Sequence, residues 1–145
     1  MINLPRWLRD GVPVLIWMAF IFSLSSQPRL ADIEDPTLER IFFKSAHIIA
    51  YGLLAWLSWR ALTADRSTTW SVLLLAFFLS TLYGISDEIH QRFVPGRHGR
   101  VADVLFDASG ALGMILLLRR VKWLRDFPEY INLVKSRMVN ESFDP

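Results

Sequence analysis

The sequence predicts an all-α, polytopic membrane protein: a bundle of four transmembrane helices followed by a cytoplasmic, partly amphipathic tail. Hydrophobic residues make up 52% of the 145 residues and the mean hydropathy is +0.30, which is too apolar for one small soluble core. Lys and Arg lie between and after the apolar stretches, as they do at the ends of membrane helices. We expect residues 1–120 to form the membrane domain and residues 121–145 the tail.

Composition also excludes several classes of function. The formal charge is only +2 and the basic residues form no single block, so the sequence does not predict binding to nucleic acid. The chain contains no cysteine, which excludes disulfides, thiolate metal sites and a cysteine nucleophile.

Four apolar stretches are candidates for membrane spans, which need about 20 residues each. The first, residues 12–24, reaches that length only with its flanks and could also be read as a signal peptide. Residues 25–28 make a poor cleavage site, so we favour a retained anchor. The other three spans are expected at residues 41–62, 70–89 and 101–118.

The distribution of basic residues predicts the orientation. Eight Lys and Arg on one side face six on the other, which favours both termini in the cytoplasm of a bacterial-type plasma membrane. The eight are Arg6, Arg9, Arg60, Arg66, Arg119, Arg120, Lys122 and Arg125, and the six are Arg29, Arg40, Lys44, Arg92, Arg97 and Arg100. The acidic cluster at residues 32–35 would then lie in an outside loop. In the tail, apolar residues recur at helical spacing and predict a segment along the inner surface: Trp123, Phe127, Ile131, Val134 and Met138.

Ionisable residues within the spans share one predicted depth. A rise of about 1.5 Å per residue places the outer boundary near Arg40, Ile89 and Arg100. We expect every ionisable residue of the spans to lie near this boundary: Lys44, His47, Asp87, Glu88, Asp103 and Asp107. Asp107 lies deepest, roughly 10 Å below the boundary, where a carboxylate must be paired, protonated or bound to metal.

Helical spacing places these residues on shared faces. Lys44, His47 and Tyr51 are spaced i, i+3, i+7, and Asp103 and Asp107 are spaced i, i+4. A charge that faces lipid costs at least about 2.5 kcal/mol, so these faces must meet each other or water. The sequence therefore predicts a polar pocket that opens outward. A structural ion-pair network is the alternative interpretation, with single residues snorkelling or capping helices.

The loop at residues 92–100 predicts a phosphate-binding element. Pro95 and Gly96 favour a turn, after which Arg97, His98 and Arg100 are expected above the carboxylates. Guanidinium groups suit phosphate oxygens, so a lipid headgroup is a candidate ligand. Salt bridges from these arginines to carboxylates of the spans are the equally weighted alternative.

Several motifs, in order over about residues 20–118, resemble the VanZ-like family of small membrane proteins, which is named for a protein of teicoplanin resistance. The motifs are Ser25-Ser26-Gln27-Pro28, Lys44-x-x-His47-x-x-x-Tyr51, Ser86-Asp87-Glu88-x-x-Gln91-x-Phe93-x-Pro95-Gly96-Arg97, Asp103-Val104 and Gly110-Ala111-x-Gly113. The family commonly has Asn where this chain has Asp107. The resemblance implies a link to glycopeptide resistance without defining a reaction.

Three functions fit these residues. The first is an enzyme acting on a phosphoester of a membrane lipid or a lipid-linked envelope precursor. Its expected residues are, for catalysis, His47, Glu88 and Asp87; for substrate binding, Lys44, Tyr51, Gln91, Arg97 and Arg100; and for metal, Asp103 and Asp107, with Mg²⁺ or Ca²⁺ as suited ions. The second is a non-catalytic binder of a lipid or antibiotic. A transporter ranks last, because the polar residues do not continue toward the inner face.

Overall fold

The structure is a computed structural model that describes residues 5–28, 35–63, 68–97, 99–121 and 124–125, with only the backbone of Arg6 and Trp7. The chain divides into two compact units, residues 1–115 and 116–145, and the boundary falls within the last helix. His98, most of the acidic cluster at residues 32–35 and the predicted amphipathic tail beyond residue 125 lie outside the described residues.

The described part of the chain contains four α-helices and no strand, which confirms the predicted fold class. They are α1 (Arg6–Ser25), α2 (Pro36–Thr63), α3 (Trp70–Gln91) and α4 (Val101–Arg120). All four are long and apolar enough to cross a membrane. The protein is therefore a multi-pass membrane protein.

Helices α1 and α2 begin earlier than the apolar stretches alone predicted, because polar residues form their first turns, whereas α3 and α4 begin as predicted at Trp70 and Val101. Helix α2 starts at Pro36 rather than at residue 41, and Asp35 caps it. The Asp35 carboxylate accepts hydrogen bonds from the backbone N–H groups of Thr37 at 2.7 Å and Leu38 at 3.2 Å, and these bonds lower its pKa. Helix α3 is capped in the same manner by Thr69.

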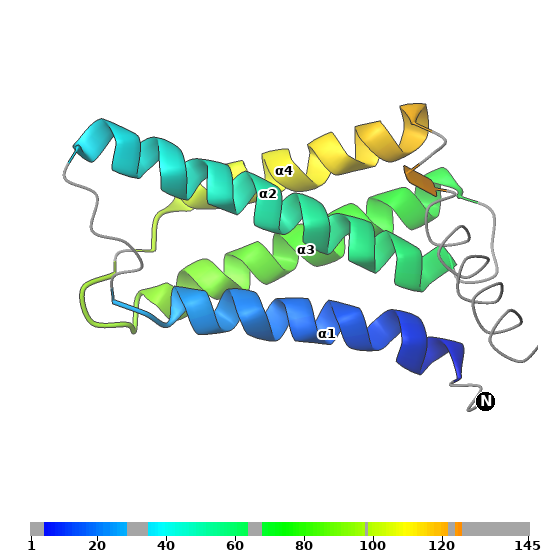
Figure 1. The fold of residues 1–145 in the computed structure, drawn as a ribbon, viewed down its shortest axis with the longest axis horizontal. Helices are drawn as coiled ribbons and strands as arrows, with labels where there is room; N and C mark the ends of the chain where they lie inside the picture. The colour runs from blue at the N-terminus through cyan, green and yellow to red at the C-terminus, as the bar shows by residue number, and fades with distance from the viewer. Residues whose placement is uncertain (1–4, 29–34, 64–67, 98, 122–123, 126–145) are drawn as a thin grey trace, which may run out of the picture. The chain divides into compact units, whose positions relative to one another are not determined.

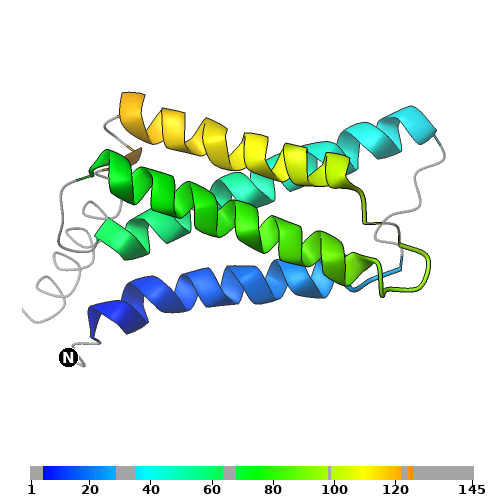
Figure 2. The same cartoon turned by 180° about the vertical axis from the view of Figure 1, so that it is seen from behind.

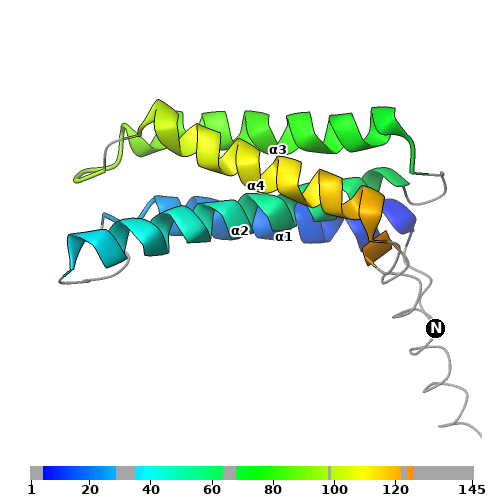
Figure 3. The same cartoon turned by 90° about the horizontal axis from the view of Figure 1, so that it is seen from above.

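The first three helices run alternately up and down and pack against one another (Figure 1). Seen from above, α3 lies on one side of a layer made by α1 and α2 (Figure 3). The ends of α1 and α3 and the beginnings of α2 and α4 gather at one end of the bundle, which we call the polar end (Figure 1). From behind, the connection from α3 to α4 is visible at this end (Figure 2). The opposite end, where α1 begins and α2 ends, is called the basic end.

Aromatic side chains hold α1 against its neighbours. The Trp17 indole N–H donates to the carbonyl of Ala50 at 2.9 Å, and the Tyr83 hydroxyl donates to the carbonyl of Met18 at 2.6 Å. The indole N–H and the phenol O–H thus each have a hydrogen-bond partner within an otherwise apolar contact. The buried core beside them is made by Ile21, Tyr51 and Leu54. Many large apolar side chains point away from the bundle and suit contact with lipid, among them Ile16, Ile49, Phe78, Leu82 and Leu105.

Glycine allows α2 and the first part of α4 to touch through their backbones. A methyl group at Gly110 would overlap the carbonyl oxygen of Ile48, and one at Gly52 would lie 3.2 Å from the carbonyl oxygen of Gly110. The absence of a side chain at Gly110 therefore permits this close helix packing. Gly113 has no neighbour within 4 Å of the equivalent position, so it makes no such contact.

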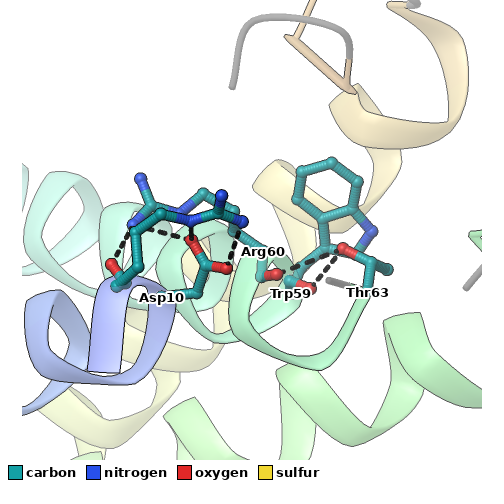
Figure 4. A network of polar contacts seen from close by, with 5 residues as sticks. Asp10, Trp59, Arg60 and Thr63 are labelled. Carbon is teal, nitrogen blue, oxygen red and sulfur yellow. Dashed lines mark hydrogen bonds and ion pairs between the residues drawn. The ribbon is translucent and has the colours of Figure 1, made fainter. Parts of the chain in front are cut away.

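The expectation that every ionisable residue of the spans lies at one end is wrong for Asp10. This residue is 6% exposed and lies at the basic end, inside α1, which begins at Arg6 rather than at residue 12. Its carboxylate accepts from the Arg9 guanidinium at 2.8 and 3.1 Å and lies 3.7 Å from that of Arg60 (Figure 4). The extra helical turn brings Asp10 into the bundle, where the arginines compensate its charge.

Candidate functional site

Three ionisable side chains from three helices meet at the polar end. They are His47 of α2, Glu88 of α3 and Asp107 of α4, and one ligand atom from each can be chosen so that all lie within 4.8 Å of one another. We call this group the triad. The structure thus brings together the two leading catalytic candidates of the sequence and one of its two metal candidates.

His47 and Asp107 form the tightest contact of the triad. Nδ1 of His47 lies 2.8 Å from Oδ1 of Asp107, which is fully buried. Gly84 of α3 makes room for the carboxylate, because a methyl group there would lie 2.9 Å from its other oxygen, Oδ2. An ionised Asp107 fixes the proton of His47 on Nδ1 and leaves the lone pair on Nε2.

Glu88 is held from the other side by the start of α4. Its Oε2 accepts a hydrogen bond of 2.8 Å from the backbone N–H of Arg100, and the side chain is 4% exposed. Arg100, predicted to bind substrate through its guanidinium, therefore contributes its amide to this site. An amide at a helix N-terminus is a favourable partner for a carboxylate.

Asp87 immediately precedes Glu88 in the sequence and is also buried, but it faces a different helix. One oxygen accepts from the Ser25 hydroxyl of α1 at 2.5 Å, and the other accepts from the Gln91 amide at 3.1 Å. Both oxygens are thus occupied by protein donors. The structure places Asp87 and Gln91 with the end of α1 and outside the triad.

Two of the predicted phosphate-binding cations, Arg97 and Lys44, have other partners in the structure. The Arg97 guanidinium donates to the carbonyls of Gln27 at 2.8 Å and Leu24 at 3.3 Å, so it caps the end of α1. The predicted turn before it is confirmed by Gly96, which has a φ of 80°. Lys44 is exposed, and its Nζ lies 4.6 Å from the centre of the Phe106 ring.

The two remaining candidates lie next to the triad. Tyr51 is buried, and its ring stacks on His47 with centroids 6.3 Å apart and an interplanar angle of 12°. Asp103 is half-buried, one turn before Asp107 on α4, and is not a member of the triad. Of the metal pair predicted from the sequence, Asp107 is thus a member of the triad and Asp103 lies one turn away.

The sequence reasoning missed the contribution of α1 to the polar end. Besides Ser25, Ser26 lies 3.0 Å from Nε2 of His90, whose ring stacks on Phe22 at a centroid distance of 4.4 Å. Ser25 and Ser26 belong to one of the family motifs, yet the sequence suggested no role for them. Their position directly after an apolar stretch, at the depth of Asp87, was the signal that could have found them.

Of the six buried side-chain polar atoms that have no hydrogen-bond partner among the described residues, three belong to the triad or to Tyr51 beside it. They are the Tyr51 hydroxyl, Oε1 of Glu88 and Oδ2 of Asp107. Buried polar atoms are nearly always paired, so three such atoms in one cluster mark it as a site that binds something. Chemically, the triad can exchange protons through His47 and Glu88 or coordinate a cation.

The comparisons with known proteins agree with the resemblance seen in the motifs. The sequence profile of the family described as VanZ/LLP1 matches residues 10–124, which include the whole triad. No curated protein and no solved structure matches the chain.

Proposed function

The chain belongs to the VanZ/LLP1 family, and on that premise we propose that it binds a phosphate-bearing lipid headgroup at the polar end and processes its phosphoester. The single observation that carries the proposal is the triad: a histidine oriented by a buried carboxylate, beside a second buried carboxylate, contributed by three helices. Helix ends of a membrane protein lie at the depth of headgroups. A lipid-linked envelope precursor has the same phosphate chemistry as a phospholipid and is included as a substrate class.

His47 and Glu88 would share the proton transfers. Glu88 accepts the proton of an attacking water or hydroxyl while the new O–P bond forms. The bond to the leaving oxygen then breaks, and that oxygen takes the Nε2 proton of His47 in its charged form, in which both ring nitrogens carry a proton. Asp107 orients the ring through Nδ1 and stabilises this charged form. The 2.8 Å contact between His47 and Asp107 supports this division of roles.

The proposal includes an orientation. With both termini in the cytoplasm, as the distribution of Lys and Arg predicts, the polar end faces the outside of a bacterial-type plasma membrane. The triad would then meet the outer leaflet, where glycopeptide antibiotics meet envelope precursors. A role in teicoplanin resistance follows as part of the proposal, and a deletion strain would then be more susceptible to teicoplanin.

Turnover of radiolabelled lipids tests the reaction. Purified protein in nanodiscs is incubated with labelled phospholipids or polyprenyl-phosphate-linked precursors, and the released products are counted. We expect His47→Ala and Glu88→Gln each to lower turnover by at least about 100-fold, since acid–base groups contribute about 10²–10⁴. His90→Ala is the matched control, because His90 lies at the same end but contacts Ser26.

Two outcomes would contradict the enzyme. Tight lipid binding that depends on the triad without any turnover would indicate a non-catalytic binder. Turnover that survives both triad substitutions but falls in His90→Ala would place the chemistry elsewhere at the polar end.

A further inference from the structure

We propose that His47, Glu88 and Asp107 bind one divalent metal ion of the Mn²⁺ or Zn²⁺ type. This inference deepens the proposed function and rests on it only for the purpose of the ion, which is to hold the phosphate and activate the attacking water. In the metal-bound form His47 and Glu88 would act as ligands in place of the acid–base roles given above. The ligand set differs from the pair predicted from sequence, because Glu88 and His47 take the place of Asp103.

The protein already holds two possible ligand atoms at a separation close to that of two ligands of one ion. Nδ1 of His47 lies 2.8 Å from Oδ1 of Asp107, so an ion would take the place of the proton between them, and the ring would then carry its proton on Nε2. A carboxylate oxygen of Glu88 completes the set, because one ligand atom from each of the three residues lies within 4.8 Å of the others.

Burial is the second, independent observation. Asp107 is fully buried and Glu88 is 4% exposed, yet Oδ2 and Oε1 have no hydrogen-bond partner among the described residues. Unpaired carboxylate oxygens are costly in an apolar interior. A bound cation would compensate both carboxylates at once, and the hydroxyl of Tyr51, also buried without a partner, could bond a water or phosphate oxygen on it.

Charge gives the third reason. A pocket of carboxylates repels a phosphate unless a cation lies between them. Two of the three cations expected to supply that positive charge have other partners: Arg97 caps α1, and Lys44 is exposed over the ring of Phe106. A divalent ion on the triad would bridge the carboxylates and the phosphate oxygens, as such ions do in phosphoryl-transfer sites.

The ligand atoms select the class of ion. One imidazole nitrogen with two carboxylate oxygens suits Mn²⁺ or Zn²⁺ better than Ca²⁺ or Mg²⁺, which prefer oxygen alone. Ligands about 2.0–2.2 Å from one ion are at most about 4.4 Å apart. One ligand atom from each member of the triad lies within 4.8 Å of the others. To bind one ion, these atoms must therefore move closer by a few tenths of an ångström at most.

Metal binding is measured directly, without substrate. Protein stripped with EDTA is placed in phosphatidylcholine nanodiscs and titrated with Mn²⁺, with free Mn²⁺ followed by electron paramagnetic resonance and Zn²⁺ added as competitor. We expect one Mn²⁺ per chain that Zn²⁺ displaces. Glu88→Gln and Asp107→Asn should each weaken binding by at least about 100-fold, because loss of an outer partner alone costs 10–100-fold.

Asp103→Asn is the matched control. It removes the same charge from the same helix, one turn away, so binding should weaken by less than about 5-fold. Equal losses in Asp103→Asn and Asp107→Asn would assign the ion to that pair and overturn the proposal. Wild-type protein without stoichiometric Mn²⁺ or Zn²⁺ would also overturn it.

A thermal-shift measurement distinguishes a folded variant that has lost the metal site from a variant that fails to fold. Mn²⁺ should raise the Tm of the wild type and of Asp103→Asn and leave that of Glu88→Gln unchanged, and a rise in Glu88→Gln would contradict the ligand set. The result is separable from the proposed function. Metal binding without lipid turnover would contradict the proposed reaction alone. Turnover without metal binding would contradict the proposed metal site alone.

Discussion

Substituting Gly110 by Ala tests the link between helix packing and the triad. Gly110 lies where α2 and α4 touch, next to the carbonyl oxygen of Ile48. Both residues of this contact are close in sequence to members of the triad. His47 immediately precedes Ile48, and Asp107 lies three residues before Gly110. A change in the distance between the two backbones must therefore reach the contact of His47 with Asp107.

The structure gives the size of the disturbance. A methyl carbon at Gly110 would lie 2.8 Å from both the Cα and the carbonyl carbon of Ile48, whereas carbon atoms in contact lie about 3.5–4.0 Å apart. These atoms belong to the backbone and cannot rotate away, so the helices must separate by about 1 Å. The same shift would lengthen the 2.8 Å contact between His47 and Asp107 to beyond hydrogen-bonding distance.

The expected cost is the sum of two effects. Overpacking costs about 1–3 kcal/mol, and loss of a hydrogen bond to a charged group costs about 1.5–3 kcal/mol. We expect Gly110→Ala to lower the free energy of unfolding by about 2–5 kcal/mol. Gly113→Ala, in the same helix but with open space around it, should change it by less than about 1 kcal/mol.

Unfolding in mixed detergent micelles, followed by circular dichroism against the fraction of denaturing detergent, measures both variants. Mn²⁺ affinity, measured as for the triad variants, should fall in Gly110→Ala and remain unchanged in Gly113→Ala. Equal stability of the two variants would show that α2 and α4 do not touch at Gly110. A destabilised Gly110→Ala with a normal 1:1 metal site would refute the coupling between packing and the triad.

Three further predictions concern other parts of the bundle. Ser25→Ala removes the 2.5 Å hydrogen bond to buried Asp87 and should lower the free energy of unfolding by about 1–3 kcal/mol in the same titration, while an unchanged midpoint would contradict the bond. Asp10→Ala should destabilise by about 1 kcal/mol, because the partly exposed Arg60 at 3.7 Å loses a carboxylate, and high salt should narrow the difference from wild type. Asp35→Ala should speed hydrogen exchange in the first turn of α2, whereas Asp35→Asn should preserve protection. The pKa of Asp35 is lowered in the folded state. The stability that the cap contributes is therefore fully present above the ordinary carboxyl pKa and is lost as the pH falls through the lowered value. Protection of the wild type that stays constant down to the lowest pH would contradict this cap.

Sequence reasoning predicted most of what depends on neighbours along the chain. The four spans follow from hydropathy and length, and α2 extends beyond its predicted span where Asp35 caps the first turn. Depth was also accessible, because the rise of a helix converts sequence position into height. His47, Glu88 and Asp107 were for that reason assigned to the same end of the spans before any contact was known.

Tertiary structure decided which residues at that end meet. Asp87 and Glu88 are adjacent in sequence but point about 100° apart on α3, so the rotation of the helix sends one to Ser25 and the other to the amide of Arg100. That rotation depends on how helices pack, including the backbone contact at Gly110. The path of the loop likewise takes Arg97 to the end of α1. The depth of a residue in the membrane depends on its own helix alone. The rotation of each helix about its axis, and hence the partners of its side chains, depends on all the helices together. The triad could therefore be identified only from the tertiary structure.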